Sequence, residues 1–198
     1  MLPILKKAKR AFINDMDKPT LAKVINDTSI KFKELMAENK DASRLHKRHY
    51  KNNLFPTISL FYALLNNGFT RDKARELSDK AFLETIMDKR KILIVLMKIP
   101  GMYKLYPTLF RKMQAKMFSS ELGFQCTYHE ASKTRCRFDM TKCFYHATCL
   151  RYNCPELCKS FCHSDDLTSD GIHKNIIWHR TKTIGNGDEL CDFEINLK

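Results

Sequence analysis

The sequence predicts an α+β fold, in which a helical N-terminal region is followed by an antiparallel sheet of two hairpins with packed helices. Apolar residues recur at helical spacing through most of residues 1–118. Apolar and polar residues alternate in two pairs of short segments, near 124–140 and 174–197. Helical segments separate the two pairs, and this order favours one antiparallel sheet with helices on one face.

Charge and cysteine content divide the chain into a basic helical region, residues 1–118, and a cysteine-rich α+β region, residues 119–198. The first region holds 25 lysines and arginines against 11 acidic residues, and the second holds 10 against 11. All eight cysteines lie in the second region. We expect the two regions to have different roles, with the site in the second.

The basic region raises the question of a nucleic-acid or membrane partner, because the pI of the sequence is near 9.4. Its cations are mixed with acids along helical segments such as TRDKARELSDK at 70–80. No zinc finger or RNA-binding aromatic motif accompanies them. The preferred interpretation is a solvated helix face with no nucleic-acid partner, and the alternative is a basic membrane-surface or nucleic-acid patch.

The chain is expected to be cytoplasmic. Its first ten residues, MLPILKKAKR, place a short apolar run before charge, the reverse of the order in a secretory signal. The longest apolar stretch, at 92–100, is far shorter than the roughly 20 residues of a membrane-spanning helix. In the cytoplasm the cysteines would be thiols or metal ligands rather than disulfides.

Helices of the first region follow from apolar spacing and from start and stop residues. Residues 20–39 repeat apolar side chains every three or four positions. Pro56 begins a helix that Asn-Asn-Gly at 66–68 ends, and Thr70 caps the next helix. Pro107 is expected to open an amphipathic segment whose Met and Phe side chains form core.

The second region is expected to begin with a hairpin that turns around 131–133. Two short helices should follow, over about 141–152 and 155–164. A closing hairpin then pairs 174–184 with 189–197.

The register of the closing hairpin predicts two inward-pointing cations. Matching the apolar Trp178 with Ile195 places Arg180 and Lys182 on the buried face with Cys191. Positive charge at this position is expected to lower the pKa of the Cys191 thiol.

An inward-pointing Arg180 needs an anionic partner, because its guanidinium is always charged. The candidates are a carboxylate of the protein, from Asp165, Asp188 or Asp192, and the carboxylate of a bound substrate.

The segment CPELCKSFCHSDD, at 154–166, places Cys162 beside Asp165 and Asp166. A thiolate here could act as a nucleophile, and the carboxylates could move a proton. The alternative is that the cysteines of this segment pack as small apolar side chains, which is the preferred interpretation for Cys158.

Four residues are candidate ligands for a divalent metal such as zinc, or for iron: Cys143, His146, Cys158 and Cys162. The chain lacks the closely spaced C-x₂-C pair that is typical of structural zinc sites. A metal is therefore the less favoured alternative.

Three motifs resemble the family of L-2-amino-thiazoline-4-carboxylic acid hydrolases: FDMTKCFYH at 138–146, CPELCKSFCHSDD at 154–166, and WHRTKTIGNGDELCDF at 178–193. The segments LFPTISLFYALLNNGFT at 54–70 and KLYPTLFRKM at 104–113 are also similar to the family. This resemblance implies a hydrolase that opens a cyclic amidine, a thiazoline ring that carries an amino group and a carboxylate.

The resemblance implies that the protein's partner is a small-molecule substrate. Arg180, with help from Lys182, would hold its carboxylate. Asp165 or Asp166 would face the amidinium group and orient or deprotonate the attacking water.

The resemblance leaves the nucleophile open between water and a thiol, either Cys162 or Cys191. A fainter similarity, in the Gly-Asp-x-x-Cys-x-Phe ending at 187–193, connects the chain with small-molecule-binding domains related to four-vinyl reductase. It implies the alternative function, a sensor-like module that binds a small molecule or a metal without catalysis.

Overall fold

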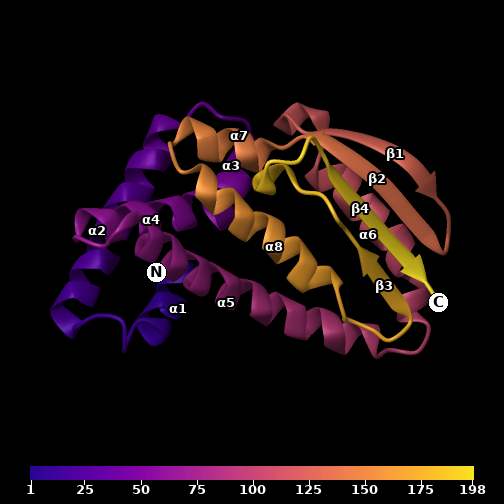
Figure 1. Cartoon of the computed structure of the whole chain (residues 1–198), viewed down its shortest axis with the longest axis horizontal. Helices are drawn as coiled ribbons and strands as arrows, with labels where there is room; N and C mark the ends of the chain where they lie inside the picture. The colour runs from indigo at the N-terminus through magenta and orange to yellow at the C-terminus, as the bar shows by residue number, and fades with distance from the viewer. The chain divides into compact units, whose positions relative to one another are not determined.

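The computed structural model describes residues 1–198 and confirms the α+β fold, with a helical N-terminal region and one four-stranded antiparallel sheet (Figure 1). Packing divides the chain into two compact units. The first unit comprises Met1–Thr85 and Arg151–Ser160, and the second comprises Ile86–Leu150 and Phe161–Lys198. This division does not coincide with the compositional boundary after residue 118. The basic helix α6 (Met102–Met117) precedes that boundary, but it packs on the sheet and belongs to the second unit.

The first unit is helical, as expected. Its elements are α1 (Pro3–Ala11), α2 (Lys18–Glu38), α3 (Arg44–His49), a π-helical turn (Tyr50–Leu54), α4 (Phe55–Asn66) and the first part of α5 (Arg71–Met97). Asp17 caps α2 by accepting a hydrogen bond of 2.8 Å from the Thr20 N–H. Pro56 lies in the first turn of α4, and Gly68 follows its end with a φ of 86°. Most side chains of α4 are buried, because the helix is apolar on nearly all sides.

Residues 151–160 belong to the first unit through polar contacts with its helices. The Tyr62 hydroxyl donates to the Tyr152 carbonyl at 2.5 Å. The Arg71 guanidinium pairs with the Glu156 carboxylate, also at 2.5 Å. These contacts hold the segment before and within a short 3₁₀ turn (Pro155–Leu157).

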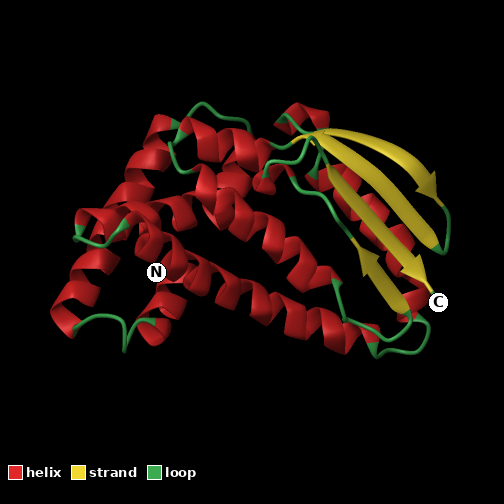
Figure 2. Ribbon diagram, in the orientation of Figure 1, coloured by secondary structure: helices red, strands yellow, loops and turns green.

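The sheet of the second unit contains both predicted hairpins (Figure 2). Its strands are β1 (Gln125–Ala131), β2 (Arg135–Lys142), β3 (Ile176–His179) and β4 (Cys191–Leu197), in the order β1-β2-β4-β3. Trp178 pairs with Ile195, so the predicted register of the closing hairpin is confirmed. The strand β3 ends at His179, and residues 180–190 form a loop with a short 3₁₀ turn.

Aromatic side chains attach α6 (Met102–Met117) to the sheet. The ring of Phe110 lies 6.3 Å from Phe138 and 6.0 Å from Trp178, and Phe138 stacks on Phe193 at 4.8 Å. Helix α6 begins at Met102, so the expectation that Pro107 opens it was wrong. Pro107 lies inside the helix. The remaining helices are α7 (Phe144–Arg151) and α8 (Cys158–Ser169). No helix in the structure is both long and apolar enough to span a bilayer.

Phe138 is fully buried at the centre of this aromatic cluster. We expect Phe138→Ala to lower the free energy of unfolding by about 3–5 kcal/mol, because it removes ring contacts on both sides and leaves a cavity. Ile177 on the same sheet is 41% exposed, so Ile177→Ala should cost less than about 1 kcal/mol. Urea denaturation of both variants checks this, and equal losses would contradict the described core.

Candidate active site

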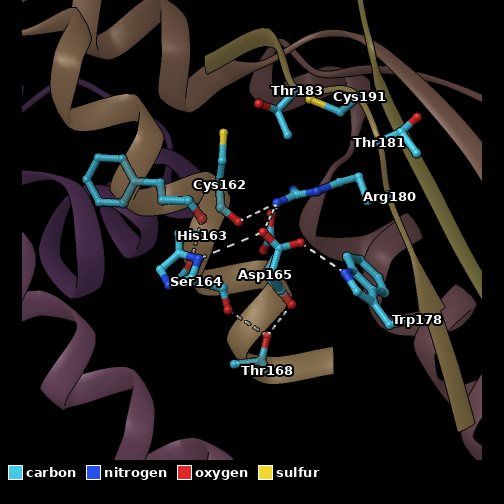
Figure 3. Close-up of polar contacts among 12 residues, drawn as sticks. Cys162, His163, Ser164, Asp165, Thr168, Trp178, Arg180, Thr181, Thr183 and Cys191 are labelled. Carbon is cyan, nitrogen blue, oxygen red and sulfur yellow. Dashed lines mark hydrogen bonds and ion pairs between the residues drawn. The ribbon is translucent and has the colours of Figure 1, made fainter. Parts of the chain in front are cut away.

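A buried arginine connects the end of β3 to helix α8 (Figure 3). The Arg180 side chain is 2% exposed, as its predicted inward direction requires. Its Nη2 donates to Asp166 Oδ2 at 2.6 Å and to the Cys162 carbonyl at 2.7 Å. Its Nη1 lies 3.4 Å from Asp165 Oδ2. Of the three expected carboxylate partners only Asp165 lies beside Arg180, and the closer partner is its neighbour Asp166, which was not among those expected.

Aromatic rings and a second donor complete this arrangement. The guanidinium carbon of Arg180 lies 5.8 Å from the centre of the Trp178 ring and 5.2 Å from that of Phe193. Trp178 Nε1 donates to Asp166 Oδ1 at 2.9 Å, so both oxygens of Asp166 accept hydrogen bonds. Burial alone would lower the pKa of Arg180, because it disfavours the charged guanidinium. The negative charges of Asp165 and Asp166 have the larger combined effect, so the pKa of Arg180 is raised.

Helix α8 places three of the predicted residues on one side. Asp165 and Asp166 follow Cys162 by three and four positions, spacings that bring side chains to the same side of a helix. The helix continues to Ser169, five residues beyond its predicted end. This extension keeps both aspartates in regular helix, where their carboxylates face Arg180.

Asp165 is the titratable group of the site. Its pKa is raised to about 7: burial is the largest cause, Arg180 opposes the shift, and the charge of Asp166 adds to it. The side chain is nevertheless 32% exposed, so a ligand can reach it. A carboxylate that titrates near neutral pH is suited to accept and return a proton.

The loop that follows Arg180 is held by carboxylates. Asp192 Oδ1 accepts the N–H groups of Thr181 and Lys182 at 2.8 and 2.6 Å, and Asp192 Oδ2 accepts the Thr181 hydroxyl at 2.5 Å. Burial alone would raise the pKa of Asp192, but these bonds lower it. Asp188 accepts the Thr183 N–H at 2.7 Å and so holds the turn rather than pairing with Arg180.

The role of Asp192 was missed in the sequence because strand alternation places its side chain on the outer face. A usable signal was present. The Arg-Thr-x-Thr segment faces an aspartate across a short turn, and aspartate side chains commonly bind loop N–H groups. The bond between Trp178 and Asp166 was missed as well, because no local spacing relates a strand tryptophan to a helix that precedes it.

Lys182 does not point inward, in contrast to the prediction. Its side chain is 49% exposed and its Nζ lies 3.4 Å from Glu189 Oε1. The prediction extended strand alternation beyond His179, where the strand ends. In the loop, hydrogen bonds to the backbone decide where side chains point.

The prediction for the Cys191 thiol was wrong in direction. Its pKa is raised to about 12, because burial outweighs the opposing effects of the Ile184 N–H and of Arg180. The Ile184 N–H donates to Cys191 Sγ at 3.2 Å, and the residue is only 3% exposed. The thiol is therefore protonated at neutral pH, which argues against a nucleophilic role.

Cys162 contributes its backbone carbonyl to the site. Figure 3 shows its sulfur directed away from Asp165, although both residues lie on α8. Its thiol remains partly exposed.

The eight cysteines are all thiols, and residues 1–198 contain no cluster of metal ligands. None of the eight cysteines forms a disulfide. Nowhere in residues 1–198 do three or more His, Cys, Asp or Glu side chains come together as ligands of one ion would. A metal at Cys143, His146, Cys158 and Cys162 stays the less favoured prediction. Cys158 is 1% exposed and belongs to the first unit.

The family model of the L-2-amino-thiazoline-4-carboxylic acid hydrolases matches residues 47–195. The chain belongs to this family. The match confirms the resemblance of the motifs and includes every residue that contacts Arg180. The family's name indicates a hydrolase. No curated protein matches the chain.

We expect the raised pKa of Asp165 to make stability depend on pH. Between its ordinary pKa of 3.8 and its folded-state pKa of about 7, the folded protein keeps a proton that the unfolded chain releases. The free energy of unfolding should therefore fall as pH rises through this interval. Asp165→Asn cannot titrate, so the stability of wild type relative to this variant should decline from pH 4.5 to pH 8.

Urea denaturation at several pH values measures this difference. Asp170→Asn, at an exposed position after α8, is the control and should follow wild type at every pH. A constant difference between wild type and Asp165→Asn would contradict the shifted pKa.

Burial and the raised pKa also predict that Cys191 resists alkylation in the folded protein. After treatment with iodoacetamide at pH 8, peptide mass mapping should find Cys191 unmodified, whereas the partly exposed Cys143 reacts. Both should react in urea. Equal labelling of the two thiols in folded protein would show that Cys191 is accessible.

Proposed function

We propose that the chain hydrolyses a small cyclic amidine, a ring like 2-amino-thiazoline-4-carboxylate, by adding water to the carbon that bears the amino group. The observation that carries the proposal is Asp165, a reachable carboxylate whose pKa is raised to about 7 beside a buried arginine. Family membership supports the class of substrate.

Asp165 is the proposed proton carrier. In its ionised form it accepts a proton from water while the water oxygen bonds to the amino-bearing carbon, which becomes tetrahedral. Asp165 then returns the proton to the departing ring atom, sulfur or nitrogen, as its bond to that carbon breaks. The ring-opened product contains the atoms of the substrate and one water.

Arg180 acts in this proposal as a positioning residue. Its side chain is 2% exposed and its Nη2 already serves two acceptors, so it is poorly placed to bind the substrate carboxylate as the sequence predicted. It holds Asp166 through a charge-assisted bond and keeps positive charge beside Asp165. Lys182, which is 49% exposed, is the cation of this loop that a substrate carboxylate could reach.

Attack by the Cys162 thiolate is the alternative chemical step. It would form a covalent bond between sulfur and the same ring carbon, which water must later break. The direction of the Cys162 side chain away from Asp165 favours direct attack by water, because a base should lie within hydrogen-bond reach of the nucleophile.

A binding module without catalysis is the second candidate function. The observation that favours it is the internal pairing of Arg180, since a group whose partners are all supplied by the protein can serve stability alone. Tight binding of the aminothiazoline carboxylate with no chemical change would support this function.

Mass spectrometry of 2-amino-thiazoline-4-carboxylate incubated with reduced protein tests the proposal. Wild type should produce a species heavier by one water, and a thiol-specific reagent then shows whether the carbon–sulfur bond has broken. Asp165→Asn should lower kcat/KM by roughly 10²- to 10⁴-fold, the usual contribution of a general base. Asp170→Asn should retain activity.

Two further results separate the mechanisms. With Asp165 as base, kcat/KM of wild type should rise with pH through about 7, because only the ionised carboxylate accepts a proton. Cys162→Ala should stay within about tenfold of wild type if water attacks directly, and should be inactive if the thiol attacks. No conversion by wild type would overturn the substrate assignment.

A further inference from the structure

Helix α6 carries apolar side chains on its outer side as well as on the side that packs against the sheet. Four of them are large and exposed: Leu105 at 54%, Leu109 at 47%, Met113 at 48% and Met117 at 37%. They are four positions apart, so they form one stripe along the helix. The stripe is separate from the inner face, where Tyr106 and Phe110 are buried.

The last turns of α5 repeat this pattern. Their exposed apolar side chains are Ile92 at 64%, Val95 at 63%, Leu96 at 43% and, just after the helix, Ile99 at 47%. Spacings of three and four place them together on one side. Only a short turn separates the two helices, and Gly101, with a φ of 81°, precedes α6. Exposed apolar surface of this extent is uncommon outside interaction sites.

The charge of this segment has a single sign. Between Asp88 and Glu121 the sequence contains no acidic residue. The cations in that interval are Lys89, Arg90, Lys91, Lys98, Lys104, Arg111, Lys112 and Lys116. The guanidinium of Arg90 forms hydrogen bonds within the second unit, donating to the carbonyls of Leu167 and Asp170. The other seven residues are exposed.

We propose that residues 89–117 bind the surface of an anionic lipid bilayer. Leucine and methionine side chains of the stripe would enter the interface, and the lysines beside them would lie among acidic headgroups. Lys112 and Lys116 lie three positions after Leu109 and Met113, the spacing of neighbouring side chains on a helix, so each cation borders the apolar stripe.

Other occupants fit the segment less well. A second copy of the chain would bring two strongly cationic surfaces together, which is unfavourable. The phosphates of a nucleic acid would pair with the lysines, but a phosphate backbone has no apolar surface to cover the leucine and methionine side chains of the stripe. An anionic bilayer complements both the charge and the apolar surface.

Sedimentation with lipid vesicles tests this inference on the full-length chain. We expect wild type to pellet with vesicles that contain phosphatidylserine and to remain in the supernatant with vesicles of phosphatidylcholine alone. Binding should weaken as salt is added, because salt screens the attraction. Absence of binding to acidic vesicles at low salt, or equal binding to both, would overturn the proposal.

Paired variants assign the surface. Lys112→Gln with Lys116→Gln should reduce partitioning roughly tenfold or more, and the exposed pair Lys23→Gln with Lys33→Gln, which removes the same charge from α2, should change it little. Leu109→Asp should abolish binding. The matched control Ile30→Asp, at a position 49% exposed on α2, should not.

Circular dichroism confirms that each variant is folded before its binding is scored. Equal losses in the test and control variants would overturn the assignment to α5 and α6. A dimer of wild type in light scattering that Leu109→Asp converts to a monomer would identify a second copy as the occupant, and would also overturn it.

Discussion

The guanidinium of Arg180 in the interior of the second unit is the constraint on which the site depends. Removing such a charge from water costs several kcal/mol, and the cost is offset only when the geometry of its partners is good. Here two aspartates, a backbone carbonyl and two aromatic rings surround it. Because these groups come from α8, β3 and β4, each of those elements must be in place for the charge to be stable.

The same constraint separates two adjacent aspartates. Asp166 accepts a bond on each oxygen, from Trp178 and from Arg180, and is held in one orientation. Asp165 makes only the longer contact of 3.4 Å with Arg180, and its surroundings raise its pKa to about 7. Two neighbouring positions on one helix therefore hold one fixed carboxylate and one that can exchange a proton, the kind of difference from which acid–base chemistry is built.

Local patterns predicted the parts of the fold that depend on local rules. The two hairpins, the pairing of Trp178 with Ile195 and the inward direction of Arg180 follow from alternation and apolar matching. The predictions for Lys182 and Cys191 failed because one depends on where a strand ends and the other on the balance of burial against charge. The cysteine-rich composition has a similar explanation. Burial raises the pKa of Cys126, Cys136 and Cys191, so these side chains behave as small apolar groups.

The strand order β1-β2-β4-β3 has a consequence for how the protein folds. The first hairpin needs only local contacts, but β3 is attached to the rest of the sheet solely through β4, which follows it in the chain. Closing this longer-range pairing carries an entropy cost that must be met before its contacts are gained. Phe193 of β4 also supplies one of the rings beside the Arg180 guanidinium, at 5.2 Å from its carbon. The surroundings of that buried charge are therefore complete only when β4 has joined the sheet, so the stability of the charge and the closure of the sheet depend on each other.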